Sequence, residues 1–186
     1  SIELAKKWIN NPTRHEIVEL KNVNTEWNEW GPRFSASEEE NEVIFTSSRP
    51  TEMSEDVDVW TGEYFSDIYT SAKLKNRELS EPNLISIEQI NTEANEGELV
   101  FAKGSTTQNV YFSRCLIQHR EQLNCAIYMT KPVKKDKKNK KRSQLEEGEE
   151  EQSPFIMIDL GDTAFNYFHP AISSDELTLY FSSNRP

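Results

Sequence analysis

The chain has 186 residues and a formal net charge of −11; 35% of its residues are hydrophobic, 28% charged and 10% aromatic. Disordered chains are usually poor in aromatic residues, so most of this chain should fold, and no apolar run is long enough for a transmembrane helix. The acidic balance disfavours nucleic acid as a partner and binding to a membrane through a basic face, because both need clustered Lys and Arg.

A helix is the first predicted element. Residues 2–9 place Leu4, Trp8 and Ile9 at helical spacing, and the pattern ends before Asn11-Pro12. We therefore expect residues 1–12 to be the end of an upstream helical region. Residues 15–20 (HEIVEL) then read as a strand, which we expect to be an outermost strand of the unit that closes the fold.

From Asn24 onward the sequence repeats. Residues 24–29 (NTEWNE) return as residues 91–96 (NTEANE), and the same offset relates residues 43–46 (VIFT) to residues 110–113 (VYFS). A third, partial copy starts at Asn166. A period of this length is typical of architectures built from stacked supersecondary units.

Each complete copy contains four runs typical of short strands. The first strand is predicted around residues 32–35 and 170–173, the second at 43–47, 110–113 and 177–182, the third at 67–70 and 126–129, and the fourth at 84–87 and 155–160. The second strand is aromatic and β-branched, which suggests burial on both faces.

Four short strands cannot bury both faces of their sheet alone, and radial stacking of such sheets solves that problem. We predict an all-β fold, a partial β-propeller of four-stranded blades, preceded by a short helix. Residues 13–186 would hold about two and a half blades: blade one at about 24–88, blade two at about 91–160 and the start of blade three at 166–186.

Several segments carry a family resemblance. Residues 30–35 (WGPRFS), 44–49 (IFTSSR), 67–69 (DIY) and 168–175 (FHPAISSD) resemble the TolB-type, WD-repeat-like propeller repeat. With its helix end, the chain is similar to OmpA-family envelope proteins of Bacteroidetes, which include a component of the type IX secretion (gliding) machinery. The turn after the first strand departs from the usual Asp-Gly, and Leu99 replaces the proline in copy two.

The resemblance implies a non-enzymatic, periplasmic scaffold or binding propeller, associated with the outer membrane and without a cofactor or metal. Its partners would be other proteins of an envelope or secretion complex, and peptidoglycan through a downstream domain. The alternative is the gating propeller of a TolB-like serine oligopeptidase. A propeller that binds glycans through exposed aromatic residues is a weaker third possibility.

Two cysteines flank the turn between the second and third strands of copy two. Adjacent antiparallel strands would bring Cys115 and Cys125 within disulfide reach, and so short a closed loop would stabilise the fold by roughly 2–3 kcal/mol. The alternative is a pair of reduced, half-buried thiols.

Other candidates have structural explanations. Residues 134–152 join a basic run to an acidic run, and we interpret them as a disordered surface insertion rather than a binding segment. His15, His119 and His169 have no partner at metal-ligand spacing. Trp27 and Trp30 belong either to the core or to a binding face.

The remaining recurring residues are interpreted as structural parts of the repeat, with Arg49, Arg185 and Asp67 as polar contacts between blades and no acid–base pair among them. This set is Pro32, Phe34, Phe45, Arg49, Asp67, Tyr69, Phe101, Phe112, Tyr128, His169, Pro170, Phe181 and Arg185.

Overall fold

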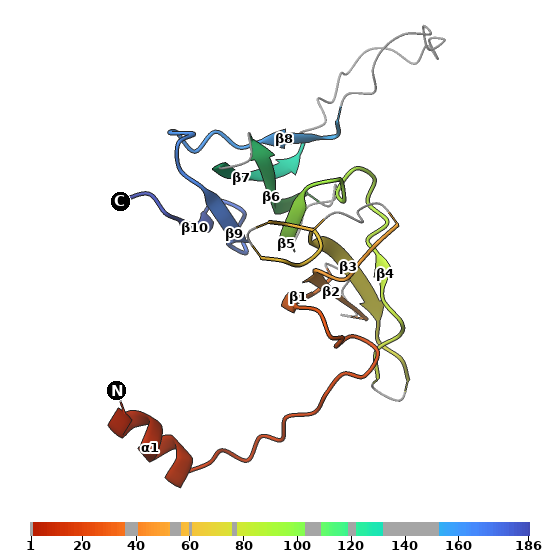
Figure 1. Cartoon of the computed structure of the whole chain (residues 1–186), viewed down its shortest axis with the longest axis vertical. Coiled ribbons are helices and arrows are strands. Elements are labelled where there is room, and N and C mark those ends of the chain that lie inside the picture. Colours follow the sequence, from red (N-terminus) through yellow and green to blue (C-terminus); the bar gives the residue numbers. More distant parts are fainter. Residues whose placement is uncertain are drawn as a thin grey trace, which may run out of the picture.

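The computed structural model describes residues 2–35, 41–52, 57–59, 61–75, 78–102, 109–118, 122–131 and 153–186. Within these ranges the chain forms three antiparallel sheets and one helix, α1 (Ile2–Asn10). The predicted all-β fold with a short N-terminal helix is confirmed. None of the residues of α1 is buried, and the helix lies away from the sheets (Figure 1).

The first two sheets have the same topology, because each follows the chain as a meander of four strands. The first contains β1 (Glu29–Phe34), β2 (Glu42–Ser47), β3 (Asp67–Ala72) and β4 (Asn83–Leu84). The second contains β5 (Asn95–Phe101), β6 (Val110–Gln118), β7 (Gln122–Thr130) and β8 (Phe155–Met157). The third pairs β9 (Tyr167–Ile172) with β10 (Leu179–Ser183).

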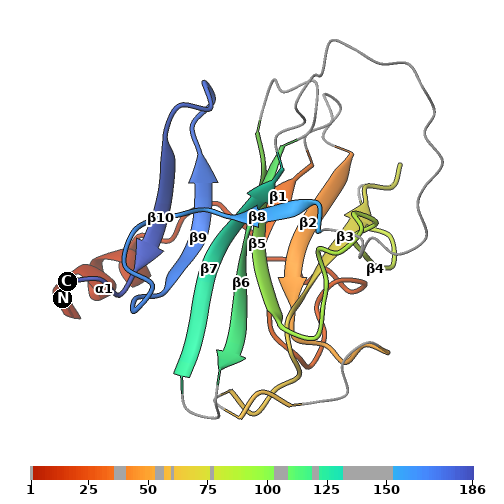
Figure 2. The same cartoon turned by 90° about the horizontal axis from the view of Figure 1, so that it is seen from above.

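The sheets stand side by side, and the first strands of the second and third sheets each pack against the sheet before them (Figures 1 and 2). β5 packs against β1, β2 and β3, whereas β9 packs against β5, β6 and β7. We call β1, β5 and β9 the inner strands. The relation between the first and second sheets therefore recurs between the second and third.

The main core fills the boundary between the first and second sheets. It takes aliphatic and aromatic residues from the two sheets together with Ile90, which comes from the connection between them and is fully buried. Burial of each such side chain contributes about 1.5–3 kcal/mol. The buried members are Ile44, Ile68, Ile90, Leu99, Val110, Phe112 and Phe155.

Strand lengths differ from the prediction in the central hairpin of the second sheet and at the outer edges of both four-stranded sheets. The β6–β7 hairpin is longer, with nine residues in each strand. The fourth strands are shorter, with two residues in β4 and three in β8. These strands lie at the outer edge of each sheet, where only one neighbour supplies hydrogen bonds, so apolar character alone overestimates their length.

The second strand of the third copy corrects one expectation. We predicted that this strand is buried on both faces, yet Tyr180 is 62% exposed and Phe181 is 42% exposed. No further sheet packs on β10 in the described part of the chain.

Residues 15–20, which we expected to be a strand, form no strand in the described part of the chain, and Ile17 is 99% exposed. The insertion at 134–152 lies outside the described residues.

Candidate functional site

A β-bulge interrupts the inner strand of every sheet at the same repeat position. The register between first and second strands shifts after Trp30 in β1, after Gly97 in β5 and after Phe168 in β9. A bulge inserts an extra residue, which bends the strand and redirects its side chain. The recurrence makes the bulge a feature of the repeat.

The bulged residues Gly31, Glu98 and His169 all have left-handed backbones, with φ of 63°, 51° and 55°. Glycine adopts this conformation freely, whereas other residues pay about 1–2 kcal/mol. Glu98 and His169 are therefore held in a conformation that their side chains disfavour, which happens only where the surrounding structure determines it.

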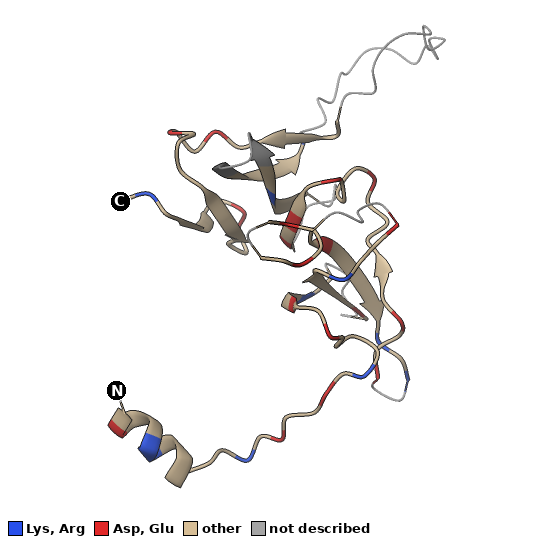
Figure 3. Cartoon of the chain, in the orientation of Figure 1, with Lys and Arg blue, Asp and Glu red and all other residues tan. Residues whose placement is uncertain are grey.

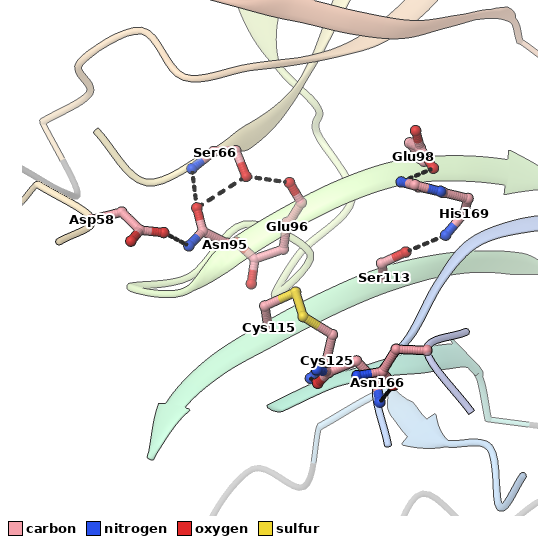
Figure 4. The surroundings of a disulfide bond; sticks show 11 residues. Asp58, Ser66, Asn95, Glu96, Glu98, Ser113, Cys115, Cys125, Asn166 and His169 are labelled. Atoms are coloured by element: carbon pink, nitrogen blue, oxygen red, sulfur yellow. Dashed lines mark hydrogen bonds and ion pairs between the residues drawn. A yellow bond between two sulfur atoms is a disulfide. The ribbon is translucent and has the colours of Figure 1, made fainter. Parts of the chain in front are cut away.

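These three residues touch one another in a row across the sheets. A Cβ atom on Gly31 would lie 2.9 Å from Cγ of Glu98, so the glycine leaves the space that the Glu98 side chain occupies. The Glu98 carboxylate is in turn 3.4 Å from Nε2 of His169 (Figure 4). The row joins all three sheets at their inner strands.

The backbone amides of two bulged residues, Glu98 and His169, each donate a hydrogen bond to the preceding sheet. Glu98 N–H donates to Oγ1 of Thr46 at 2.9 Å, and His169 N–H donates to Oγ of Ser113 at 3.1 Å. Thr46 and Ser113 are equivalent residues of β2 and β6. The same bond therefore docks two successive pairs of sheets.

A second hydrogen bond between the sheets also recurs. Oδ1 of Asn95 accepts from the Ser66 amide at 2.9 Å, and Oδ1 of Asn166 accepts from the Cys125 amide at 2.8 Å (Figure 4). Both asparagines precede their bulge by three residues. Two repeated bonds at equivalent positions mean that each sheet is placed on its neighbour in the same way.

In the second sheet, a buried ion pair fixes the start of the inner strand. Nε of Arg114 lies 2.7 Å from Glu96, whose side chain is fully buried, and the Thr92 hydroxyl donates to the same carboxylate at 2.6 Å. The guanidinium stacks over the rings of Phe112 and Tyr128. Burial raises the pKa of Glu96, against the opposing effects of Thr92 and Arg114.

The first sheet repeats this arrangement with an arginine from a different position. Arg49 lies 3.2 Å from Glu29, Thr25 donates to Glu29 at 2.6 Å, and the guanidinium stacks over Phe45 and Tyr69. Our expectation that Arg49 contacts the next blade is therefore corrected, because its ion pair lies within its own sheet.

Arg185, which we also expected between blades, lies in an exposed segment, where its backbone amide donates to Oγ of Ser183 at 3.1 Å. Asp67, the third residue that we expected between blades, lies on β3, which packs against β5. It is 1% exposed, Thr51 donates to one of its oxygens at 3.3 Å, and the other has no hydrogen-bond partner in the described part of the chain. Burial, and then the charge of Glu96, raises the pKa of Asp67 to about 7.

Cys115 and Cys125 face each other on β6 and β7 and are joined by a disulfide, with their Cα atoms 3.9 Å apart (Figure 4). The Cα atoms are closer than the 5.5–6 Å typical of disulfides, and the two residues pair directly in the register of the hairpin. The bond closes the hairpin at the side of the second sheet where Asn166 docks.

A small pocket of about 110 Å³ opens where the three inner strands meet. Trp30 lines it from β1, Gly97 and Glu98 from β5, and Phe168 and His169 from β9. The strands therefore bring aromatic walls, a carboxylate and an imidazole to one place. We call this pocket the inner-strand niche.

The two tryptophans that the sequence left undecided have different surroundings. Trp30 lines the niche, whereas Trp27 packs edge-on against Tyr64, with ring centroids 5.1 Å apart. His169 lies at the bulge of β9, with its side chain 57% exposed. His119 lies outside the described residues, and His15 lies in the exposed N-terminal segment.

Sequence reasoning missed Glu98, Arg114 and the hydroxyls of Thr46 and Ser113. The two hydroxyl residues sit at the repeat offset, so the signal for them was present. Glu98 gave no signal, because the bulge position holds three different residue types, and Arg114 gave none, because it lies two residues away from the position equivalent to Arg49.

Across the described ranges, no helix is long and apolar enough to cross a membrane, and no three metal-binding side chains are grouped. Comparisons with protein-family models, with curated proteins and with solved structures find no match to this chain.

Proposed function

We propose that this chain is part of a β-propeller that acts as a non-enzymatic binding scaffold. The observation that carries the proposal is the repetition of the same two hydrogen bonds between successive sheets. Sheets placed on one another by one repeated rotation build a ring around the inner strands. β5 and β9 each contact the first three strands of the preceding sheet, which supports the same arrangement.

In this proposal the ring continues beyond the three sheets. The third sheet has two strands, and the exposed rings of Tyr180 and Phe181 are available for packing of a further sheet. Residues 15–20, extended and exposed, would supply the outermost strand of the last blade. Such closure protects the open edges of the terminal sheets, which otherwise promote aggregation.

The scaffold would bind other proteins at the face of the ring, where loops from every blade meet. On the resemblance to OmpA-family envelope proteins, we place it in the periplasm at the outer membrane, within a type IX secretion complex, with peptidoglycan bound by a downstream domain. The disulfide between Cys115 and Cys125 supports an oxidising compartment.

Affinity purification of the intact protein from the envelope of its source bacterium tests this role. We expect outer-membrane components of the secretion machinery to co-purify, and the protein to sediment with peptidoglycan. A protein recovered from the cytoplasm without these partners, or one that hydrolyses peptides through a serine hydrolase domain in the same polypeptide, would contradict the proposal.

A further inference from the structure

The inner-strand niche exists because one of three equivalent positions lacks a side chain. Trp30, Gly97 and Phe168 have the same place on β1, β5 and β9, each opposite a hydroxyl residue of the adjacent strand. Because β5 packs between β1 and β9, the glycine lies between two aromatic residues. An aromatic residue at Gly97 would fill the space that the niche provides.

The backbone conformation of β5 does not require a glycine at position 97. Its φ lies outside the left-handed region, and a Cβ atom there would meet only the Thr46 side chain at 3.9 Å, an ordinary contact. Gly31, in contrast, has a positive φ and a contact at 2.9 Å. The absence of a side chain at Gly97 therefore has no explanation in local geometry, and it leaves a cavity open at the surface.

The charged groups around the niche are predominantly acidic. Glu96 and Glu98 line it, no Lys or Arg does so among the described residues, and β5 carries acidic positions in Figure 3. Because Glu96 is already paired with Arg114, Glu98 supplies the carboxylate for a ligand. Oε2 of Glu98 is buried and accepts no hydrogen bond in the described part of the chain, although His169 Nε2 lies 3.4 Å away. Burial raises the pKa of Glu98, against the charges of His169 and Arg33.

We propose that the inner-strand niche binds the guanidinium group of an arginine side chain presented by a protein partner. A planar guanidinium stacks on aromatic rings, and Trp30 and Phe168 supply two such rings. Its N–H donors match the carboxylate of Glu98, and charge-assisted hydrogen bonds of this kind are the strong ones. A niche of about 110 Å³ suits the end of one side chain rather than a whole ligand.

The acidic body of the protein supports the same class of partner. Its net charge of −11 attracts a basic surface and raises the rate of encounter. This inference rests on the proposed scaffold function, because it assigns the chemistry of one contact to the partner of that scaffold.

The test uses the intact protein and two probes, Nα-acetyl-arginine amide and Nα-acetyl-glutamine amide, titrated in ligand-observed NMR. We expect magnetisation to be transferred from the protein to the arginine side chain, with a signal that saturates as the probe concentration rises, and no transfer to the glutamine probe. Glu98→Gln should weaken arginine binding about tenfold, as the loss of a hydrogen bond to a charged group does. Gly97→Leu should abolish it by filling the niche.

Two controls separate the niche from general effects. Glu16→Gln removes the same charge from an exposed position and should leave binding unchanged, and thermal unfolding establishes that Gly97→Leu is folded. Equal binding of both probes, or arginine binding that persists in Glu98→Gln and Gly97→Leu, would overturn the inference. If Gly97→Leu still captures the envelope partners, the inference that the niche binds them is wrong, whereas the proposed scaffold function is unaffected. If the unaltered protein captures no partner, the proposed scaffold function itself is wrong.

Discussion

Glu98 and His169 occupy the same position in neighbouring inner strands, and their side chains meet at 3.4 Å across the boundary between the second and third sheets. Both have positive φ, and both donate their amide to a hydroxyl of the preceding sheet. Residues of different chemistry thus carry out the same backbone function. What the repeat conserves at this point is the bulge.

Gly31→Ala should destabilise the protein for two separable reasons. The alanine would adopt a left-handed backbone, which costs about 1–2 kcal/mol, and its Cβ would lie 2.9 Å from Cγ of Glu98. Gly62→Ala is the matched control, because Gly62 has φ of 73° but no atom near its Cβ position. Urea unfolding should show a larger loss for Gly31→Ala than for Gly62→Ala, and truncation of Glu98 to alanine should remove the difference. Equal losses in the two variants would argue against the contact.

Arg114→Met should lower the free energy of unfolding by about 3–5 kcal/mol, because it leaves the fully buried Glu96 carboxylate without its cation. Adding Glu96→Leu should restore most of the loss, since two apolar residues need no pairing. Arg49→Met is the comparison in the first sheet, where the ion pair is longer and Glu29 less buried, and should cost less. Denaturant unfolding of the four proteins measures these differences; a small effect of Arg114→Met alone would contradict the account.

Asp67 should make stability fall as the pH rises. Its pKa in the folded protein is about 7, above the value near 4 of an unfolded chain, so between these values the folded state holds a proton that the unfolded state has released. The contribution is complete below about pH 4 and lost by pH 7. Asp67→Asn should therefore flatten the pH dependence and raise stability at pH 8, whereas Glu16→Gln should do neither. Parallel pH profiles of Asp67→Asn and the unaltered protein would refute this.

The disulfide should be present in the native protein and should contribute to its stability. Alkylation without reductant, followed by intact-mass measurement, should leave both cysteines unmodified, and reduction should expose two thiols. Replacing Cys115 and Cys125 together with alanine should cost about 2–3 kcal/mol, the value for so short a closed loop. Two alkylated cysteines before reduction would show that the bond is absent.

The sequence predicted the repeat and most strands because strand pairing and core packing depend on apolar patterns that recur at fixed offsets. Phe45 and Phe112 are examples, since both are buried and both stack on the tyrosine of the next strand. The ends of strands were less predictable, as β4 and β8 show, because pairing at an edge depends on neighbours rather than on composition.

The candidate site was harder to predict for a physical reason. The niche arises because Gly97 lies between two aromatic residues of neighbouring strands and because bulges turn Glu98 and His169 toward each other, and the residue types alone predict neither arrangement. The arginine of the second sheet reaches the same carboxylate position from a different place in the chain. The two arginines therefore make the same contact in their sheets, although they are not at equivalent positions of the sequence repeat.

The central claim is that successive sheets dock by one repeated set of contacts that builds a propeller. An experimental structure of the intact polypeptide, with the sequence that flanks these residues, tests it most directly. We predict a further sheet packed on β9 and β10, with the amide of its inner-strand bulge bonded to Oγ of Ser182, the residue equivalent to Thr46 and Ser113. A structure in which Tyr180 and Phe181 stay in solvent, or in which the sheets pack face to face as a sandwich, would contradict the claim.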